Sequence, residues 1–375
     1  MTEEPQERVD QAALQRSPLH VAHDQAGAKF ASFAGWQMPL EYTGIVAEHN
    51  AVRTSVGIFD VSHLGTTLVR GPGAVAALNR ILTNDLDRIG PGQAQYTLLC
   101  TPEGDVVDDL IAYVFGPDDV LLIPNAGNAA RVNSVIAEMV GNDIEVIDAQ
   151  QDTAIIAVQG PRSRELLGAL GLPTDLAYMA VARSELMGVE VVVCRTGYTG
   201  ELGFELLIPA ADAVRVWEAL LTAGGPLGVL PCGLGSRDTL RTEMGYPLHG
   251  QDLGGGIGPV AARLNWAIGW DKPEFRGREA IVQSRHSDLQ PRLRGLVLLE
   301  RGVPRPGVSV HLEPSGPSLG TVTSGTFSPT LKTGIALALL EAGVSDGDEV
   351  VLNVRGRMLA ARVTPPPFVA GTVRD

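Results

Sequence analysis

The chain has 375 residues, 45% of them hydrophobic, which is enough to bury a large core and to form two or three domains. Its formal net charge of −14 argues against nucleic acid or an anionic membrane surface as the main partner. No apolar run approaches the ~20 residues that span a bilayer, and the three cysteines follow no Cys-x-x-Cys pattern, so we expect a cytoplasmic protein without a metal site.

The N-terminal region opens with acidic residues and matches neither a secretory signal nor a basic transit peptide. We therefore expect a loose acidic tail over residues 1–16. His20 and His23 follow, three residues apart, a spacing that can place two metal ligands on one helical face, but no third ligand is evident nearby. Residues 33–42 then predict an aromatic loop punctuated by Gly and Pro, and residues 45–54 predict a helix.

The middle of the chain contains an internal duplication. A strand pattern, a Gly-Pro pair and a helical pattern occur at Gly71 and again at Gly160. A second match joins Pro124 to Pro209, each of which follows Leu-Leu-Ile and precedes a helical pattern. Two related halves are therefore predicted, each with the order strand, helix, strands, strand, helix. That order is typical of an α+β unit with helices on one face of an antiparallel sheet.

A β-hairpin is predicted over residues 96–113, because two strand-forming runs flank a turn at 101–104. Its second arm carries Asp108 and Asp109 between apolar residues, so at least one carboxylate should face a half-buried surface. Spacing alone favours an acidic turn on a solvated edge, and a functional acid pair is the alternative. Neighbouring strand residues face opposite sides, so only one of the two can point into a site.

The second half has three glycines within residues 195–205, which indicate either a simple hairpin or a turn where the backbone closely approaches another group. A short helix then places Arg237 and Arg241 on one face, with Ser236 as the expected N-cap.

Two further segments complete the chain. The glycine run at 254–258 is weak as a phosphate loop, because it neither follows a strand nor opens a helix with the required spacing. From about residue 291, short β runs separated by Gly and Pro predict six strands of a small barrel or jelly roll.

Six motifs, taken in chain order, resemble the aminomethyltransferase family, the T proteins of the glycine cleavage system. They are Phe33-Ala-Gly-Trp36-Gln-Met-Pro39, Phe59-Asp-Val-Ser-His63, Asp108-Asp-Leu-Ile111, Gly197-Tyr-Thr-Gly-Glu201 with Glu205, Arg237-Asp-Thr-Leu-Arg241 and Val322-Thr-Ser-Gly325 with Ser328. Each motif is weak by itself, but all six in order are specific and span nearly the whole chain after the tail.

The resemblance implies an α+β fold shaped as a three-lobed cloverleaf, with two related lobes built on antiparallel sheets and a C-terminal β-barrel or jelly-roll lobe. The first, folate-binding lobe would comprise residues 17–64 and 151–239. The second, which would carry the catalytic aspartate, would comprise residues 65–150 and 240–289. Residues 290–375 would form the C-terminal lobe.

The resemblance also implies a reaction, in which the aminomethyl group on the lipoyl arm of the H protein goes to tetrahydrofolate. The products are methylene-tetrahydrofolate, ammonia and the dihydrolipoyl carrier. By position, Asp109 matches the catalytic aspartate of the family. The positions that match folate contacts are Tyr96, Asn125, Tyr198, Glu205 and Arg237. A carboxylate such as Glu205 suits the two parallel N–H donors of a pterin, and Arg237 would orient that carboxylate.

The chain departs from the usual family residues at Leu64, at Ala261 and in the segment 367–373, which lacks a tyrosine, so we predict no ligand contact from the C-terminal lobe. Two other functions remain open. One is a folate-dependent demethylating enzyme, whose relatives usually carry a flavin domain that we do not expect here. The other is a non-catalytic folate-binding protein for iron–sulfur cluster upkeep, whose relatives carry Lys-Gly-Cys where this chain has a different sequence at 195–198.

Overall fold

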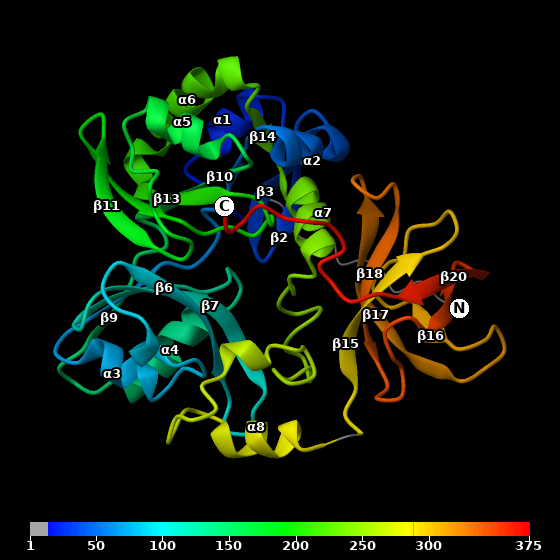
Figure 1. Ribbon diagram of the computed structural model, residues 1–375. Coiled ribbons are helices and arrows are strands. Elements are labelled where there is room, and N and C mark those ends of the chain that lie inside the picture. The colour runs from blue at the N-terminus through cyan, green and yellow to red at the C-terminus, as the bar shows by residue number, and fades with distance from the viewer. Residues whose placement is uncertain (1–13, 288) are drawn as a thin grey trace.

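Three large sheets organise the chain, and Figure 1 shows them as three groups of strands. They are described by a computed structural model that covers residues 14–287 and 289–375. Most of the predicted acidic tail, residues 1–13 of 1–16, lies outside the described residues. At its end, β1 (Gln15–Arg16) pairs in parallel with β3 (Trp36–Glu41), so these two residues belong to the fold and not to a tail.

A five-stranded antiparallel sheet has the strand order β6-β7-β8-β5-β9. Its elements in chain order are β5 (Thr67–Arg70), α3 (Ala74–Asn79), the 3₁₀ turn η2 (Leu86–Arg88), β6 (Gln93–Cys100), β7 (Val106–Gly116), β8 (Asp119–Ile123), α4 (Ala129–Met139) and β9 (Glu145–Asp148). The predicted hairpin over 96–113 is the β6–β7 pair, and Gly104 completes its turn with a positive φ of 86°.

A six-stranded sheet has the order β11-β12-β13-β10-β4-β14, antiparallel except for the parallel pair β14 and β4. Its strands are β4 (Gly57–Asp60), β10 (Thr153–Gln159), β11 (Val181–Leu186), β12 (Val189–Cys194), β13 (Gly203–Pro209) and β14 (Leu230–Cys232). The helical elements after β10, β13 and β14 are α5 (Ser163–Ala169), η3 (Ala210–Asp212), α6 (Ala213–Gly224), η4 (Gly225–Leu227) and α7 (Leu234–Met244).

The predicted duplication is confirmed by the element order, which runs β5-α3-β6-β7-β8-α4 in one half and β10-α5-β11-β12-β13-α6 in the other. The two Gly-Pro positions also adopt the same backbone. Gly71 has a φ of 140° and Gly160 a φ of 134°, and a Cβ on either would collide with a carbonyl oxygen, that of Asp143 or of Ser55. Only glycine fits a corner this close to another backbone.

The two halves exchange one strand. β4 precedes the first half in sequence but pairs with β10 of the second half, whereas β9 precedes the second half but pairs with β5 of the first. Each sheet is therefore completed by the strand that immediately precedes the other half in the sequence. The sequence pattern did not predict this exchange, because both strands are short and either of them could pair in either sheet.

Alternation along the strands buries both faces of each sheet. On β13, Leu206 packs in a cluster with Trp217 and Leu220 of α6, while Leu207 joins a second cluster. That second cluster also contains Tyr113 and Leu121 of the five-stranded sheet. The two sheets thus share one buried layer, and each is covered by its own helices on the other face, as Figure 1 shows.

The third group of strands is a closed six-stranded barrel of order β15-β18-β17-β16-β19-β20, as the six predicted β runs anticipated. Its strands are β15 (Arg292–Leu298), β16 (Ser309–His311), β17 (Ser318–Ser328), β18 (Thr333–Leu340), β19 (Glu349–Val354) and β20 (Arg357–Val363). The 3₁₀ turn η5 (Asn265–Ala267) and α8 (Arg278–Arg285) lie in the segment that connects α7 to the barrel. The lobe boundaries given above stay a prediction.

The N-terminal elements match the sequence in part. The helix predicted over 45–54 is α2 (Ile45–Thr54). The predicted aromatic loop over 33–42 is instead the end of a hairpin between β2 (Lys29–Phe33) and β3, with its turn at Ala34 and Gly35. Within α1 (His20–Gln25), the His23 Nε2 atom lies 2.8 Å from Asp60 Oδ2, and the structure of the described residues contains no cluster of three potential metal ligands.

The expected cap at Ser236 is wrong, because Gly233 is the N-cap of α7 and the Ser236 hydroxyl donates back to the Gly233 carbonyl. Cys100, Cys194 and Cys232 are free and buried. None of the helices in the described part of the chain has the length and apolar character required to cross a membrane.

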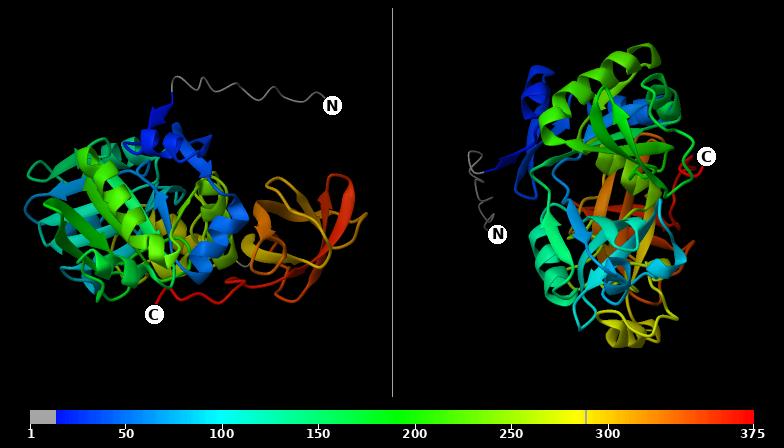
Figure 2. Two further views of the ribbon diagram at one scale, coloured as in Figure 1. Left: turned by 90° about the horizontal axis from the view of Figure 1, so that it is seen from above. Right: turned by 90° about the vertical axis from the view of Figure 1, so that its left-hand side faces the viewer.

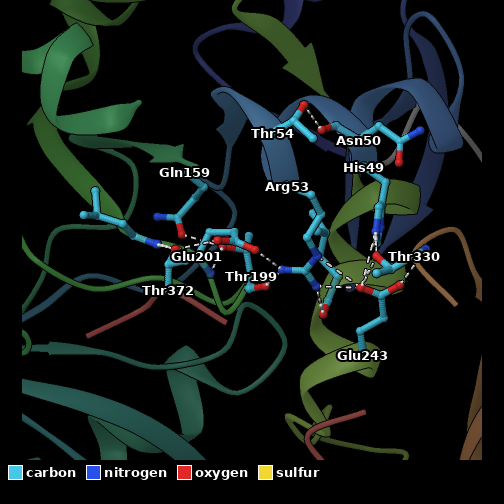
Figure 3. A network of polar contacts seen from close by, with 12 residues as sticks. His49, Asn50, Arg53, Thr54, Gln159, Thr199, Glu201, Glu243, Thr330 and Thr372 are labelled. Atoms are coloured by element: carbon cyan, nitrogen blue, oxygen red, sulfur yellow. Dashed lines mark hydrogen bonds and ion pairs between the residues drawn. The ribbon is translucent and has the colours of Figure 1, made fainter. Parts of the chain in front are cut away.

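A buried polar network ties the sheets to the barrel (Figure 3). Arg53 of α2 forms ion pairs with Glu201, before β13, and with Glu243 of α7, each with an N–O distance of 2.8 Å. Glu243 also accepts a hydrogen bond from the Thr330 hydroxyl at 3.0 Å, and Thr330 belongs to the turn between β17 and β18. Thr372 donates to Glu201, so the C-terminal segment joins the same network. Figures 1 and 2 show this segment running from the barrel back to the six-stranded sheet.

Candidate active site

A cavity of about 960 Å³ lies where the two sheets, α7, the barrel and the C-terminal segment meet. Its volume falls in the range of small-molecule sites, roughly 300–1,000 Å³. The residues predicted for the site that line this cavity are Tyr96, Asp109, Asn125, Tyr198, Glu205 and Arg237. Residues from four separate stretches of sequence therefore reach one space.

The acid pair lies at the start of β7. Asp109 lines the cavity, where its Oδ2 accepts a hydrogen bond from the Tyr96 hydroxyl at 2.9 Å. Asp108 is fully buried, and its carboxylate turns toward the loop between β8 and α4. This matches the expected strand alternation. However, the side-chain amide of Asn125 lies 2.9 Å from Oδ1 of Asp108 and 2.9 Å from Oδ1 of Asp109, so the two acids are not independent.

Burial changes the protonation of the pair. It raises the pKa of Asp108 and of Asp109, so both carboxyl groups resist ionisation. Burial also raises the pKa of Tyr96, so its hydroxyl stays protonated and donates to Asp109. Because both carboxyl groups are buried and contact the same Asn125 amide, they resist being ionised at the same time.

The other end of the site is built by the second half and α7. The Thr196 hydroxyl donates to Glu205 Oε2 at 2.6 Å, and no donor from the described chain reaches Oε1. Arg237 lies over the Tyr198 ring, with 4.9 Å between guanidinium carbon and ring centroid. Tyr198 stacks on Tyr246 with ring centroids 5.7 Å apart. The segment thus presents flat apolar surface beside a carboxylate and a guanidinium.

The expected direct pairing of Arg237 with Glu205 does not occur among the described residues. Arg237 Nη1 is buried and has no hydrogen-bond partner. Burial lowers the pKa of Arg237, and the nearby Glu205 charge opposes that effect. The two groups therefore lie close enough to interact electrostatically, while each keeps an unused hydrogen-bonding atom.

Glycines let the backbone come close to the site, as the three glycines at 195–205 suggested. A Cβ on Gly197 or Gly203 would collide with the Gln159 side chain. Gly200 has a φ of 82°, and its Cβ would collide with Met244 of α7. Close approach to neighbouring side chains, and not a simple hairpin, explains these glycines.

Several cavity residues were missed by sequence reasoning. Asn128 donates to Asp108 Oδ1 at 2.6 Å and lies 3.0 Å from Nδ1 of His249. Trp266 stacks on Tyr96 with centroids 5.0 Å apart. His63 is buried, and burial followed by the charge of Arg237 lowers its pKa to about 4. Only His63 carried a signal, since it ends the motif 59–63. Asn128 caps a helix, Trp266 lies in a short 3₁₀ turn and His249 lies in a loop, and none of these positions has a periodicity that marks it.

Unsatisfied polar atoms concentrate on this cavity. The cavity-lining residues with a buried and unpartnered side-chain atom are His63, Gln95, Arg237, His249 and Arg294. Buried polar groups are normally hydrogen-bonded, so such atoms indicate a ligand that supplies donors and acceptors. Fold and site together define a three-part α+β protein with a central cavity of small-molecule size, which is lined by aromatic rings, unpaired polar atoms and one member of an acid pair.

Comparisons with known proteins identify the family. Residues 19–272 match the family model described as GCVT N-terminal domain, and residues 292–370 match the Glycine cleavage T-protein C-terminal barrel domain. The chain belongs to the family of glycine cleavage T proteins, the aminomethyltransferases.

Individual relatives agree with this assignment. The chain is 57% identical to an aminomethyltransferase from Parafrankia sp. (strain EAN1pec) over 363 residues, which cover 96% of this chain and 99% of that protein. It is 51% identical to an aminomethyltransferase from Mycobacterium bovis, covering 97% of this chain and 100% of the relative. The crystal structure of the glycine cleavage system aminomethyltransferase T from Bartonella henselae superposes with a TM-score of 0.90 at 34% identity, covering 96% and 100% of the two chains. None of these relatives favours the demethylating or iron–sulfur alternatives.

Proposed function

We propose that this chain is the cytoplasmic aminomethyltransferase of a glycine cleavage system. It would move the aminomethyl group from the lipoyl arm of the H protein to tetrahydrofolate, and release methylene-tetrahydrofolate, ammonia and the dihydrolipoyl carrier. The single observation that carries the proposal is the cavity, which brings Asp109 of one half and Glu205 of the other into one space with unsatisfied polar atoms around it.

The residues present fit tetrahydrofolate. A pterin offers parallel N–H donors, which the free Oε1 of Glu205 and its partner Oε2 can accept, and acceptors that Arg237 Nη1 can serve. The stacked rings of Tyr198 and Tyr246 supply a flat apolar contact. When bound, tetrahydrofolate supplies two nitrogen nucleophiles that take up the one-carbon unit.

Asp109 is the residue that we assign to the chemistry. Its carboxyl group lines the cavity and is held by Tyr96 and by the Asn125 amide. A carboxyl group beside the reacting carbon can hold a proton and pass it to the departing nitrogen, and once ionised it stabilises positive charge on that carbon. The hydrogen bonds fix its position before the substrate arrives, so little reorganisation is needed in the transition state.

The lobe assignment is part of the proposal. Residues 17–64 and 151–239 would hold the pterin end, residues 65–150 and 240–289 would hold the acid pair, and residues 290–375 would close the site. Membership in the three sheets supports this division. The lipoylated H protein is the proposed partner, and its arm must be long enough to carry the aminomethyl group to Asp109.

Reconstitution tests the function. Lipoylated H protein, loaded with the aminomethyl group from labelled glycine, is mixed with tetrahydrofolate with and without this chain. We expect labelled methylene-tetrahydrofolate and ammonia in equal amounts, and only when the chain is present. Ammonia release at the same slow rate in both mixtures would exclude the proposed activity.

A further inference from the structure

The role of Asp108 is not explained by the site described so far. It is fully buried, does not line the cavity, and still touches the same amide as Asp109. A buried carboxyl group must be neutralised, paired or surrounded by donors. Asp108 has no cation within ion-pair distance in the described part of the chain, so its surroundings decide its charge.

Every hydrogen bond to the Asp108 carboxylate comes from an N–H donor. Its Oδ2 accepts from the backbone N–H of Asn125 at 2.8 Å. Its Oδ1 accepts from the side-chain amides of Asn125 at 2.9 Å and of Asn128 at 2.6 Å. Three N–H donors stabilise the ionised form, and a protonated Asp108 would point its O–H at donors.

Asp109 has different surroundings. It accepts one hydrogen bond from Asn125 and one from the Tyr96 hydroxyl, and its remaining exposure is toward the cavity. A hydroxyl oxygen can also accept, so Tyr96 tolerates a proton on Asp109. Because two buried carboxylates this close resist being ionised together, the proton that they share belongs on Asp109.

We propose that Asp108 is a positioning residue whose fixed negative charge keeps a proton on Asp109 near neutral pH, so that Asp109 enters the reaction as an acid. This inference rests on the proposed function for its chemical role. The carbon–nitrogen bond of the aminomethyl group breaks with its electron pair moving to nitrogen. That nitrogen takes the Asp109 proton and leaves as ammonia. The Asp109 carboxylate then accepts the proton released as the first folate nitrogen bonds to the carbon. The second folate nitrogen displaces the lipoyl sulfur from that carbon, and the proton of this nitrogen goes to the sulfur, which leaves as the dihydrolipoyl thiol.

Other titratable groups face the pair. Tyr96 lies on β6 and Tyr198 on the segment before β13, and burial raises the pKa of both, so both stay neutral. His249, on the segment after α7, lies near enough for its charge to lower the pKa of Asp109, against the larger effect of burial. Its Nδ1 accepts a hydrogen bond from the Asn128 side-chain amide at 3.0 Å.

A carbon-13 NMR titration of aspartate carboxyl groups tests the assignment without any need for activity. The wild type should show one aspartate that titrates near neutral pH. The substitution Asp109→Asn should abolish this titration, while Asp108→Asn should keep it and lower its midpoint by about one pH unit or more, because a like charge is removed. The opposite pattern, in which Asp108→Asn abolishes the titration, would overturn the proposal.

A kinetic experiment tests the chemical role. If Asp109 must carry a proton, transfer falls as the pH rises through the pKa of the pair, and Asp108→Asn should move that alkaline limb to lower pH. Asp105→Asn is the matched control, because it removes an exposed carboxylate from the same hairpin and should leave the limb in place. An unmoved limb in Asp108→Asn overturns the role in catalysis. Loss of all transfer by the wild type would instead refute the proposed function, while the NMR result would still stand.

Discussion

The two related halves share a fold but contribute different chemistry to one cavity. In the first half, the hairpin strand β7 carries the acid pair, and the loop between β8 and α4 supplies the amides of Asn125 and Asn128 that hold it. In the second half, the equivalent strand β12 is apolar apart from Glu190, and η3 leads directly from β13 into α6. The site residues there lie instead on β13 and on the segment before it.

This difference shows how a duplicated unit can specialise. The strands and helices that build the cores are kept, since Gly71 and Gly160 make the same backbone corner in both halves. Different connections serve the site in the two halves. The loop between β8 and α4 holds the carboxylates in the first half, and the glycine-rich segment between β12 and β13 lies beside Glu205 in the second. We infer that the first half performs the reaction and the second half recognises the pterin end of the folate.

The largest effect is expected for Asp109→Asn. An amide carries no charge and neither gives up nor takes a proton, while its size and hydrogen bonding keep the packing around β7. Turnover should fall by ~10²–10³, typical of removing one electrostatic group that acts in the transition state. Steady-state transfer measures this, and calorimetry should find tetrahydrofolate binding close to wild type. Asp105→Asn serves as the control, and activity within a few-fold of wild type in Asp109→Asn would remove the residue from the chemistry.

The substitution Glu205→Gln should weaken folate binding. It replaces half of a two-oxygen acceptor with an amide donor that faces a donor, and a lost charge-assisted hydrogen bond is worth roughly 1.5–3 kcal/mol. Calorimetric titration with tetrahydrofolate measures the dissociation constant. An unchanged constant would mean that Glu205 does not contact the ligand.

The shared corner predicts similar losses of stability in both halves. Gly71→Ala and Gly160→Ala force a side chain into a left-handed backbone against a carbonyl oxygen, which we expect to lower the free energy of unfolding by about 1–3 kcal/mol each. Chemical denaturation measures the change. Gly168→Ala is the control, because a Cβ there has nothing within 4 Å and Gly168 lies within helix α5. A large loss at one corner and none at the other would contradict their equivalence.

The smallest effect concerns salt. If the H protein docks through complementary charge, its apparent Michaelis constant should rise with ionic strength while saturating turnover changes little. Transfer rates at low and physiological salt measure this. A constant that stays the same would argue for docking without an electrostatic contribution.

The sequence predicted the elements that carry periodicity or repetition. The helix over 45–54, the acid hairpin, the six barrel strands and the duplication all follow from local patterns. The sequence did not predict how segments that are distant along the chain pair with one another. The exchange of β4 and β9 depends on two short strands that could pair in either sheet, and the hairpin of β2 and β3 was hidden by its Gly and Pro content.

The site residues also divide into those that the sequence predicted and those that it missed. Motif resemblance identified six residues that line the cavity, but it treated Asp108 as independent of Asp109. Strand alternation was the correct rule for the backbone, and yet Asn125 reaches both carboxylates from a loop. Asn128 and His249 were missed for the same reason, because loop side chains have no period that would place them in a site.

The division between the halves is tested most directly by single-turnover transfer from preloaded H protein, measured for both variants at rising tetrahydrofolate concentration. We predict that Glu205→Gln recovers to within a few-fold of the wild-type rate once folate saturates, because only recognition is impaired. Asp109→Asn should stay ~10²–10³ slower at every folate concentration. If saturating folate restores Asp109→Asn as well, or leaves Glu205→Gln equally slow, the assignment of chemistry to one half and recognition to the other is wrong.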